Sequence, residues 1–346
     1  MNGMGTDPTQ RANTLPNVWE VSVEICEFIK MDLPSRPTII DPWLRKSSLV
    51  MIYAERGIGK TWFALSIALS ITRGTPIGGW DADKPTGVLY IDGEMAADEM
   101  QGRIKSLAAA LPSPLAPFRI LSSDLLHQKG MPSVNINNPA WRRQIAEGLS
   151  SQTEIGVLIL DNLSCLTPGI EENEKKAWDE INQWLIGLRH QGIAVILLHH
   201  AGKSGSQRGT SGREDALDIV IGLSTPPGYK PVDGARFTVQ FEKARGVSGD
   251  SLSPFVFSIG EDSDGNTVWL TDEPTSSGNK GRVIALLGSG KTPSEITETV
   301  KCSKQAVSKH KNWAIEKGFL SEDSRTKRIT LTESGREKYA SYQVDF

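Results

Sequence analysis

One segment, residues 48–61, limits more than any other what this chain can fold into. It begins with the apolar run Leu-Val-Met-Ile-Tyr, continues as Ala54-Glu-Arg-Gly-Ile-Gly59 and ends with Lys60-Thr61 at the start of an amphipathic stretch. This order predicts a buried strand, a glycine-bearing loop and a helix, an arrangement that holds nucleoside triphosphate phosphates on backbone N–H groups and a helix N-terminus. The simpler alternative, a helix capped by a glycine-rich turn, does not explain why Lys and Thr stand together in the first turn.

The residue types of this loop predict their roles. Lys60 would reach the outer phosphates and Thr61 would ligate Mg²⁺, so ATP and Mg²⁺ are the expected cofactors. Ala54 stands where the usual pattern has its first glycine. The predicted nucleotide-binding residues are Ala54, Glu55, Arg56, Gly57, Ile58, Gly59, Lys60, Thr61 and Trp62.

A second Gly-Lys-Thr occurs at residues 290–292 and has a different context. The preceding stretch has a helical pattern, and Thr292-Pro-Ser-Glu295 has the spacing of a capping box with Pro293 in the first helical position. Proline there would also disturb a turn that cradles phosphate. We therefore interpret this copy as the start of a helix and not as a nucleotide site.

Composition places the chain among globular proteins without a membrane span. Of its 346 residues, 38% are hydrophobic and 23% are charged, and no run of eighteen apolar residues occurs. Residues 1–16 are polar, which favours a disordered leader over a signal peptide. The three cysteines are too widely spaced for a metal site or a disulfide framework, and we expect a cytoplasmic location.

Charge is unevenly distributed along the chain. Residues 280–346 carry 13 Lys and Arg against 8 Asp and Glu, a net charge of +5. The remainder carries −8, since the whole chain carries −3. A basic segment attached to an acidic body indicates a nucleic-acid contact at the C-terminal end.

Hydrophobic patterning predicts an α/β fold over residues 43–271, preceded by a helix at 17–31 and a proline-containing connector at 34–42. Continuous apolar runs are typical of parallel strands covered on both faces. The first predicted strand lies near Leu49, and the others are 87–92, 118–121, 156–161 and 193–199; the predicted helices are 59–73, 96–111, 139–150 and 174–190. Four further strands, expected to be antiparallel and to lie at the sheet edge, are 219–223, 235–242, 254–258 and 267–270.

Beyond a linker at 272–279, residues 280–346 have the pattern of a small winged helix-turn-helix domain. The predicted elements are helices at 280–287, 293–300 and 303–317, a hairpin of 319–322 with 328–332, and a last helix. The third helix would offer side chains suited to phosphates or base edges, and the wing would add cations. The candidate DNA-binding residues are Lys304, Gln305, Ser308, Lys311, Arg325 and Lys327. Winged helices also dock proteins, so that alternative stays open.

Two carboxylates at strand ends complete the expected chemistry. Asp161 closes the apolar run 157–160 and fits the Mg²⁺-binding position, with a structural cap of the following turn as the alternative. Glu94, just past the strand 87–92, is the candidate that orients or deprotonates the attacking water. Asp92 is its competitor at the strand end.

These motifs resemble the RecA-like core of the RepA/DnaB class of hexameric helicases. The resemblance rests on Leu-Tyr-Ile-Asp-Gly-Glu94-Met and Leu-Ile-Leu-Asp161-Asn and covers residues 34–270. It implies that the catalytic glutamate follows the second core strand. It also implies that a polar residue at the end of strand 193–199 senses the γ-phosphate, for which His200 is preferred over His199.

The segment Lys243-Ala-Arg245-Gly246 resembles the Lys-x-Arg-x-Gly signature of DnaB-like ATPases, although here glycine follows arginine directly. The resemblance implies that both cations reach the nucleotide of an adjacent subunit, where the permanent planar charge of arginine stabilises the transferring phosphoryl group. The alternative is a surface strand with salt-bridged Lys and Arg.

A Gly- and Ser-rich loop at 201–218 carries Lys203, Arg208 and Arg213. Such a cationic loop suits a phosphodiester backbone gripped without reading of sequence. It contains no aromatic residue, so base stacking is not indicated, and an ordinary solvated loop is the alternative.

Taken with the resemblance, the sequence predicts an ATP-dependent helicase or translocase on single-stranded DNA, assembled as a hexameric ring and active in plasmid or mobile-element replication. The winged helix would add contact with duplex DNA. Two alternatives are a regulatory ATPase that switches assembly at a DNA target without moving along it, and a recombinase-like filament ATPase.

Overall fold

A computed structural model of the chain describes residues 17–78, 80–82, 84–109, 113–169, 175–201, 216–249, 252–261, 267–272, 278–300, 304–323 and 326–339. The chain divides into two units, residues 1–36 and 37–346. The leader predicted at 1–16 lies outside the described residues. Within the described part, no helix has the length and apolar character needed to cross a membrane.

The prediction of one continuous helix over residues 17–31 is wrong. Two single-turn helices form instead, α1 (Val18–Val21) and α2 (Ile25–Phe28). Ser22 and Glu24 are extended between them, and the Glu24 carboxylate accepts the N–H of Cys26 at 2.7 Å, which starts a new helix at that point. A side-chain cap that competes with the helical backbone bonds explains the break.

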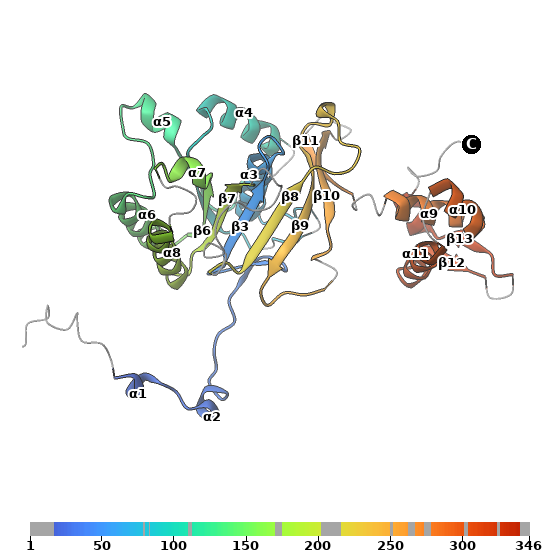
Figure 1. The fold of residues 1–346 in the computed structure, drawn as a ribbon, viewed down its shortest axis with the longest axis horizontal. Coiled ribbons are helices and arrows are strands. Elements are labelled where there is room, and N and C mark those ends of the chain that lie inside the picture. Colours follow the sequence, from blue (N-terminus) through green and yellow to red (C-terminus); the bar gives the residue numbers. More distant parts are fainter. Residues whose placement is uncertain are drawn as a thin grey trace, which may run out of the picture. The chain divides into compact units, whose positions relative to one another are not determined.

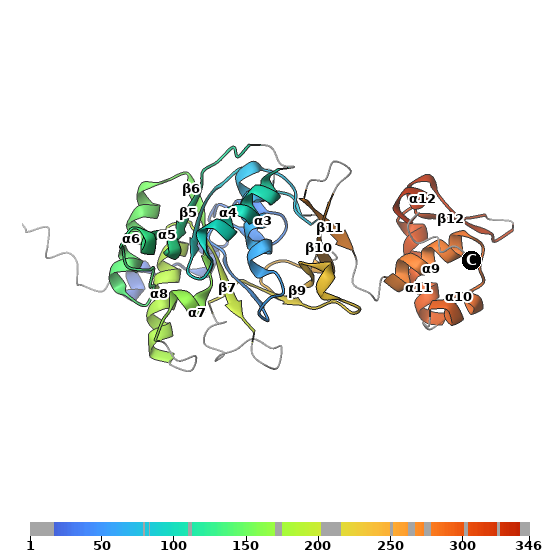
Figure 2. The ribbon, with the colours of Figure 1, turned by 90° about the horizontal axis from the view of Figure 1, so that it is seen from above.

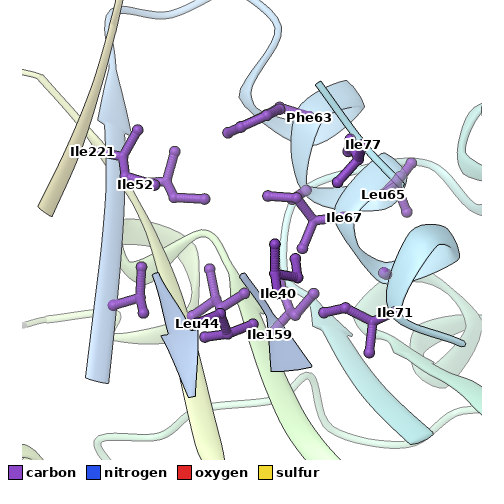
Figure 3. Packing of buried hydrophobic residues seen from close by; sticks show 14 of the residues in the cluster. Ile40, Leu44, Ile52, Phe63, Leu65, Ile67, Ile71, Ile77, Ile159 and Ile221 are labelled. Atoms are coloured by element: carbon purple, nitrogen blue, oxygen red, sulfur yellow. The ribbon is translucent and has the colours of Figure 1, made fainter. Parts of the chain in front are cut away.

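The predicted connector contains a small hairpin. β1 (Thr38–Ile40) pairs antiparallel with β2 (Leu44–Arg45). Ile40, Trp43 and Leu44 are at most 1% exposed and pack into the main core. Figure 3 shows Ile40 and Leu44 among the side chains that pack with α3.

The centre of the fold is a nine-stranded sheet in the order β11-β10-β9-β8-β3-β7-β6-β4-β5. Its parallel strands are β3 (Leu49–Ala54), β4 (Gly87–Asp92), β5 (Phe118–Ser122), β6 (Ile155–Asp161), β7 (Ala194–His200) and β8 (Ile219–Ser224). Its antiparallel strands are β9 (Arg236–Ala244), β10 (Phe255–Glu261) and β11 (Thr267–Asp272). The predicted class, a mostly parallel RecA-like sheet with antiparallel strands appended, is confirmed.

One strand direction differs from the expectation. β8 was expected to be antiparallel, but it runs parallel to the P-loop strand β3 and only its other neighbour, β9, is antiparallel. Asp218 fixes this pairing: its N–H donates to the Leu49 carbonyl at 2.8 Å and its carboxylate accepts the Leu49 N–H at 3.0 Å. Both strands therefore begin at the same edge, which an apolar pattern alone does not specify.

Helices cover both faces of the sheet (Figures 1 and 2). α3 (Lys60–Arg73) and α4 (Ala97–Ala108) pack on the face that presents Val50 and Ile52, whereas α6 (Pro139–Ser151) and α8 (Lys175–His190) pack on the face that presents Leu49 and Met51. Full burial of each such side chain contributes about 1.5–3 kcal/mol. This explains why the strands are apolar at every position and not at alternate ones. Besides the β1–β2 hairpin, the described part of the ATPase region contains three short elements that were not predicted: α5 (Ser123–Gln128), α7 (Leu163–Leu166) and the 3₁₀ helix Pro231–Asp233.

The C-terminal segment has a core of its own. Its elements follow the predicted order: α9 (Gly278–Gly288), α10 (Pro293–Val300), α11 (Lys304–Glu316), the hairpin of β12 (Leu320–Glu322) with β13 (Ile329–Leu331), and α12 (Glu333–Tyr339). Ile284, Ile296, Val307 and Leu320 lie in this core. Most of the predicted linker, 273–277, lies outside the described residues.

Candidate nucleotide site

The carboxyl ends of four parallel strands meet at one edge of the sheet. Ala54 at the end of β3 pairs with His200 at the end of β7, and Asp92 at the end of β4 pairs with Asp161 at the end of β6. β6 and β7 are neighbours. The loop after β3, both carboxylates and His200 therefore share the edge at which open α/β sheets bind ligands.

The loop after β3 reaches its helix through Gly59. This residue caps α3 with a φ of 119°, a conformation that side chains rarely adopt. A Cβ at Gly59 would also lie 3.0 Å from the Phe237 ring and 3.4 Å from the Ala235 Cβ. Glycine is required here, and the loop leads directly into the N-terminus of α3, whose first N–H groups have no partner within the helix, as an anion site requires.

Lys60 is buried although it carries charge. Its Nζ donates to the carbonyls of Ala54 and Glu55, both at 3.0 Å, and only 6% of the residue is exposed. Burial lowers the pKa of Lys60 to about 8, an effect that Asp161 and Glu94 oppose. A buried ammonium at the loop mouth, beside two carboxylates, is suited to a polyanionic ligand that would favour its charged form.

Thr61 and Asp161 form the centre of the site. The Thr61 hydroxyl donates to Asp161 Oδ2 at 2.8 Å, and the hydroxyl of Tyr90 donates to the same oxygen at 2.7 Å. Burial raises the pKa of Asp161, while these two hydrogen bonds oppose the rise. The structure thus brings together the two residues predicted to bind metal and adds Tyr90, which holds the aspartate in place.

Asp92 lies at the end of the neighbouring strand and is 1% exposed. Its Oδ2 accepts the N–H of Met95 at 3.0 Å, whereas Oδ1 has no hydrogen-bond partner within the described residues. Burial, reinforced by Asp161, raises the pKa of Asp92 to about 7. A buried oxygen without a donor is a position that a cation or a bound water would satisfy.

The residues present fit Mg²⁺. In nucleotide sites this ion takes one or two protein oxygens and completes its shell with phosphates and water. The Thr61 hydroxyl and the Asp161 carboxylate supply such oxygens, with Asp92 beside them. Across the described ranges, no group of three or more His, Cys, Asp or Glu side chains could hold a metal unaided. The site therefore suits an ion that binds together with the phosphates.

The Glu94 carboxylate lies close to Asn162, after β6, and to His200, at the end of β7. Its side chain is 55% exposed, and its Oε2 accepts a hydrogen bond from Asn162 Nδ2 and lies 3.8 Å from His200 Nε2. His199, by contrast, is 2% exposed. The structure places the preferred residues of both predicted pairs, Glu94 and His200, next to each other.

Trp62 follows Thr61 on α3 and is half-buried. The guanidinium of Arg103, on α4, lies over its ring with the Cζ 5.2 Å from the ring centroid. Such a contact contributes about 0.5–1 kcal/mol at an exposed site. The pair forms a flat cationic and aromatic surface beside the phosphate loop.

Lys243 and Arg245 lie toward the amino ends of the parallel strands, away from the end of β3 that carries the phosphate loop. Lys243 pairs with Val220 of β8, which pairs with Met51 of β3, and the backbone N–H of Arg245 donates to the Asp218 carbonyl at 2.9 Å. At about 3.3 Å per residue and 4.8 Å per strand, the Lys243 backbone is about 10 Å along and 10 Å across from the end of β3. The structure does not bring these two residues to the phosphate loop of their own chain.

The candidate DNA-binding residues are only partly described. Lys203, Arg208, Arg213 and Arg325 lie outside the described residues, as does the side chain of Gln305. Lys304, Ser308 and Lys327 are exposed. Lys311 Nζ lies 3.2 Å from Glu322 Oε2, so it joins α11 to the hairpin.

Sequence reasoning missed three residues of the site: Tyr90, Arg103 and Asn162. Tyr90 looks like an ordinary apolar strand residue, and Arg103 like a solvated helix residue. Asn162 carried a signal, because an amide directly after the metal-type aspartate falls at the same strand end. Their roles depend on contacts with residues 41 or more positions away along the chain, which no local pattern records.

Comparison with curated proteins gave no match. Among solved structures, the crystal structure of a KaiC-like protein from the hyperthermophilic archaeon Pyrococcus horikoshii OT3 matches with 15% identity and a TM-score of 0.45, over 68% of this chain and 99% of that one. A family model described as an AAA domain, AAA_25, matches residues 18–206. Because that match spans more than half of the chain and includes both the phosphate loop and Asp161, the chain belongs to the AAA_25 family of AAA domains and is a P-loop ATPase with a RecA-like core, of a kind that uses ATP and usually Mg²⁺.

Proposed function

We propose that this ATPase works as a hexameric ring that moves along single-stranded DNA, as a helicase or translocase of plasmid or mobile-element replication. The observation that carries the proposal is the separation of the site components within one chain. Lys60, Thr61, Glu94 and Asp161 gather at the carboxyl ends of the parallel strands, and Lys243 and Arg245 lie toward the amino ends. A head-to-tail ring would join these ends.

In the proposed reaction, Mg²⁺ on Thr61 and Asp161 would neutralise charge on the β- and γ-phosphates. The water oxygen bonds to the γ-phosphorus, its proton passes to Glu94, and the bond to the bridging oxygen breaks with its electron pair left on ADP. Lys60 and the neighbour's Arg245 and Lys243 stabilise the developing negative charge. His200 reports the state of the γ-phosphate, and Trp62 with Arg103 offers a stacking surface to the base.

The N-terminal segment supports an oligomer. Within residues 17–36, nine large apolar side chains are at least 45% exposed. They are Val18, Trp19, Val21, Val23, Ile25, Phe28, Ile29, Met31 and Leu33. A contiguous apolar series of this kind marks a protein–protein contact.

DNA contact is proposed for two places. Lys203, Arg208 and Arg213 on the loop after His200 would grip a single strand, and their link to the γ-phosphate sensor would couple grip to hydrolysis. Residues 280–346, joined by the linker 272–279 to the ATPase domain 43–271, form the proposed winged-helix domain, whose exposed Lys304, Ser308 and Lys327 would meet duplex DNA. The protein would act in the cytoplasm.

Complementation tests the shared site. Lys60→Ala subunits lack a working phosphate loop but keep Arg245, whereas Arg245→Ala subunits have the opposite defect; alone, each should lose hydrolysis on the order of 10³-fold or more. Mixed at equal amounts, about a quarter of head-to-tail junctions would combine an intact loop with an intact arginine. Single-turnover hydrolysis should then reappear, and it should not if Arg245 acts within its own chain. Arg336→Ala, an exposed arginine of α12, is the control and should hydrolyse normally.

DNA stimulation separates the alternatives. Closed rings whose hydrolysis rises with single-stranded DNA, and which unwind a forked duplex, would support the translocase. Tight sequence-specific duplex binding without unwinding would favour the regulatory ATPase, and open filaments on DNA would favour the recombinase-like protein. Replacement of Lys203, Arg208 and Arg213 by Ala should remove the stimulation and leave basal hydrolysis unchanged.

A further inference from the structure

Asn162 connects the catalytic edge to the short helix α7. It directly follows Asp161 and is 1% exposed. Its Oδ1 accepts the N–H of Cys165 at 3.2 Å, which caps α7, and its Nδ2 donates to Glu94 Oε2. One amide group therefore holds a helix on one side and the proposed water-orienting carboxylate on the other.

The cap determines which end of the amide faces Glu94. Oxygen and nitrogen of an asparagine side chain are assigned from their partners, and here the partners agree. The Cys165 N–H requires an acceptor and the Glu94 carboxylate requires a donor. Rotation of the amide would break both bonds, so Asn162 is a donor of fixed direction.

The strand end is built to permit this contact. Gly93 lies between Asp92 and Glu94, and a Cβ there would approach Leu166 Cδ2 to 2.9 Å and Cys165 Cβ to 3.1 Å. Its N–H donates to the Asp161 carbonyl at 2.7 Å. The chain after β4 is thereby held against α7, which brings Glu94 within reach of Asn162.

Both neighbours of the Glu94 carboxylate lie on the same oxygen. Asn162 Nδ2 and His200 Nε2 face Oε2, the latter at 3.8 Å. In the part of the chain that the structure describes, Oε1 has no hydrogen-bond partner. A glutamate that is more than half exposed would otherwise sample several rotamers. Anchorage through Oε2 leaves Oε1 in one orientation.

We propose that Asn162 is a positioning residue for hydrolysis, which fixes Glu94 by Oε2 so that Oε1 meets the attacking water. This rests on the proposed role of Glu94. Misplacement of a catalytic group by about 1 Å can cost on the order of 10²-fold in rate. Asn162 acts only through Glu94 and needs no contact with the nucleotide.

Two variants separate the donor from the cap. Serine and aspartate both cap helices, so Asn162→Ser and Asn162→Asp preserve α7 and its thermal stability. Asn162→Ser removes the donor, and kcat should fall about 10- to 100-fold while the affinity for ATP stays unchanged. Asn162→Asp places a carboxylate against Glu94, so kcat should fall further and the acid limb of the pH–rate profile should move to higher pH, because adjacent carboxylates share a proton.

Asn138→Ser is the matched control. Asn138 caps α6 in the same way, with its Oδ1 accepting the Ala140 N–H at 2.9 Å, and none of the hydrogen bonds that the structure describes for it reaches the site residues. The same substitution there should leave both kcat and the pH–rate profile unchanged.

Glu94→Gln distinguishes failure of this inference from failure of the proposed site. It should bind ATP and not hydrolyse it; hydrolysis at the wild-type rate would refute the role of Glu94 itself. If Glu94→Gln is inactive but both Asn162 variants keep the wild-type kcat and pH profile, the positioning role is wrong. Faster hydrolysis by Asn162→Ser would also overturn it, because the amide would then restrain Glu94 rather than present it.

Discussion

The tripeptide Gly-Lys-Thr occurs at residues 59–61 and again at 290–292, and the two copies differ in burial and in the residues that they contact. Lys60 is 6% exposed and bonded to the carbonyls of its own loop, and Thr61 donates to Asp161 100 residues away. Lys291 has a side chain that is 41% exposed and lies 3.8 Å from Glu295, within the same helical turn. The first copy contacts a residue of a strand that is distant in sequence, whereas the second copy contacts a residue of the helix that it begins.

The preceding element explains the difference. The first copy follows the buried strand β3, whose carboxyl end lies among those of β4, β6 and β7. The second follows α9, and the interpretation of it as a helix cap is confirmed: the Thr292 N–H and hydroxyl each donate to Glu295 Oε2 at 2.7 Å, and the Glu295 N–H donates back to Thr292 at 3.4 Å. Identical residues thus acquire different chemistry from the strands or helices that surround them.

The largest contrast is expected between Lys60→Ala and Lys291→Ala. Loss of the buried ammonium removes the charge at the phosphate loop, so hydrolysis should be abolished. Lys291 forms an exposed ion pair with Glu295, in the helical C-terminal segment and not at the phosphate loop, so its loss should leave steady-state hydrolysis unchanged. If the two changes reduced ATP turnover equally, the claim that only the first copy belongs to the nucleotide site would be wrong.

Asp92→Asn tests the buried charge beside the first copy. Because burial raises the pKa of Asp92 to about 7, the folded protein keeps a proton between about pH 4 and pH 7 that the unfolded chain releases. Stability therefore falls as pH rises through this window and stays reduced above pH 7. Asparagine cannot ionise, keeps an acceptor for the Met95 N–H, and should add a few kcal/mol of unfolding free energy at pH 8, on the order of that pKa shift.

Urea unfolding of nucleotide-free, Mg²⁺-free protein between pH 4 and pH 8 measures this effect. The difference between Asp92→Asn and wild type should grow with pH and level off above pH 7. Two curves that stay parallel over the whole range would show that the pKa of Asp92 is the same in the folded and the unfolded chain.

Tyr90→Phe tests the support of Asp161. The ring remains in place, but the donor to Asp161 Oδ2 is lost. Loss of a partner that orients a metal ligand typically costs 10- to 100-fold in metal affinity, so half-maximal hydrolysis should need about tenfold more Mg²⁺. Tyr53→Phe is the control, because Tyr53 donates to Glu242 on the antiparallel side of the sheet. If both variants changed the Mg²⁺ requirement equally, the effect would not belong to Asp161.

The smallest effect is expected at the second copy. Thr292→Ala removes the helix cap and should make α10 about 1 kcal/mol easier to open, without effect on hydrolysis. Hydrogen exchange of the α10 amides in the full chain measures this. The hydroxyl of Thr299 donates to the Glu295 carbonyl within the helix and caps nothing, so the control Thr299→Ala should not open α10. Altered ATP turnover in Thr292→Ala would mean that the second copy takes part in the site.

The sequence predicted most of the main elements because their signals are local. The apolar runs, Gly59 and the Thr292 cap can each be recognised within a few residues of sequence, because the structure that they form is local. The errors arise where a single side-chain hydrogen bond decides, whether its partner is local or distant. A single cap at Glu24 divides the predicted first helix, and Asp218 aligns β8 with β3 although its apolar pattern is indifferent to direction.

The candidate site divides in the same way. Lys60, Thr61, Glu94 and Asp161 could be named from the sequence, because each has a residue type suited to the chemistry and lies just after a predicted strand or at its end. Their support could not: Tyr90 and Asn162 act through hydrogen bonds to residues 68 or more positions away. The position of Lys243 and Arg245 follows from the register of β9, which only the assembled sheet defines.

By itself the sequence determined that this chain has a phosphate loop, a mostly parallel sheet and the carboxylates of an ATPase, because backbone sterics and hydrophobic periodicity act over short distances. Only the tertiary structure decided that Thr61 and Tyr90 meet on the same oxygen of Asp161 and which oxygen of Glu94 is held. Those outcomes depend on hydrogen bonds between strands, and such bonds exist only once the strands are side by side.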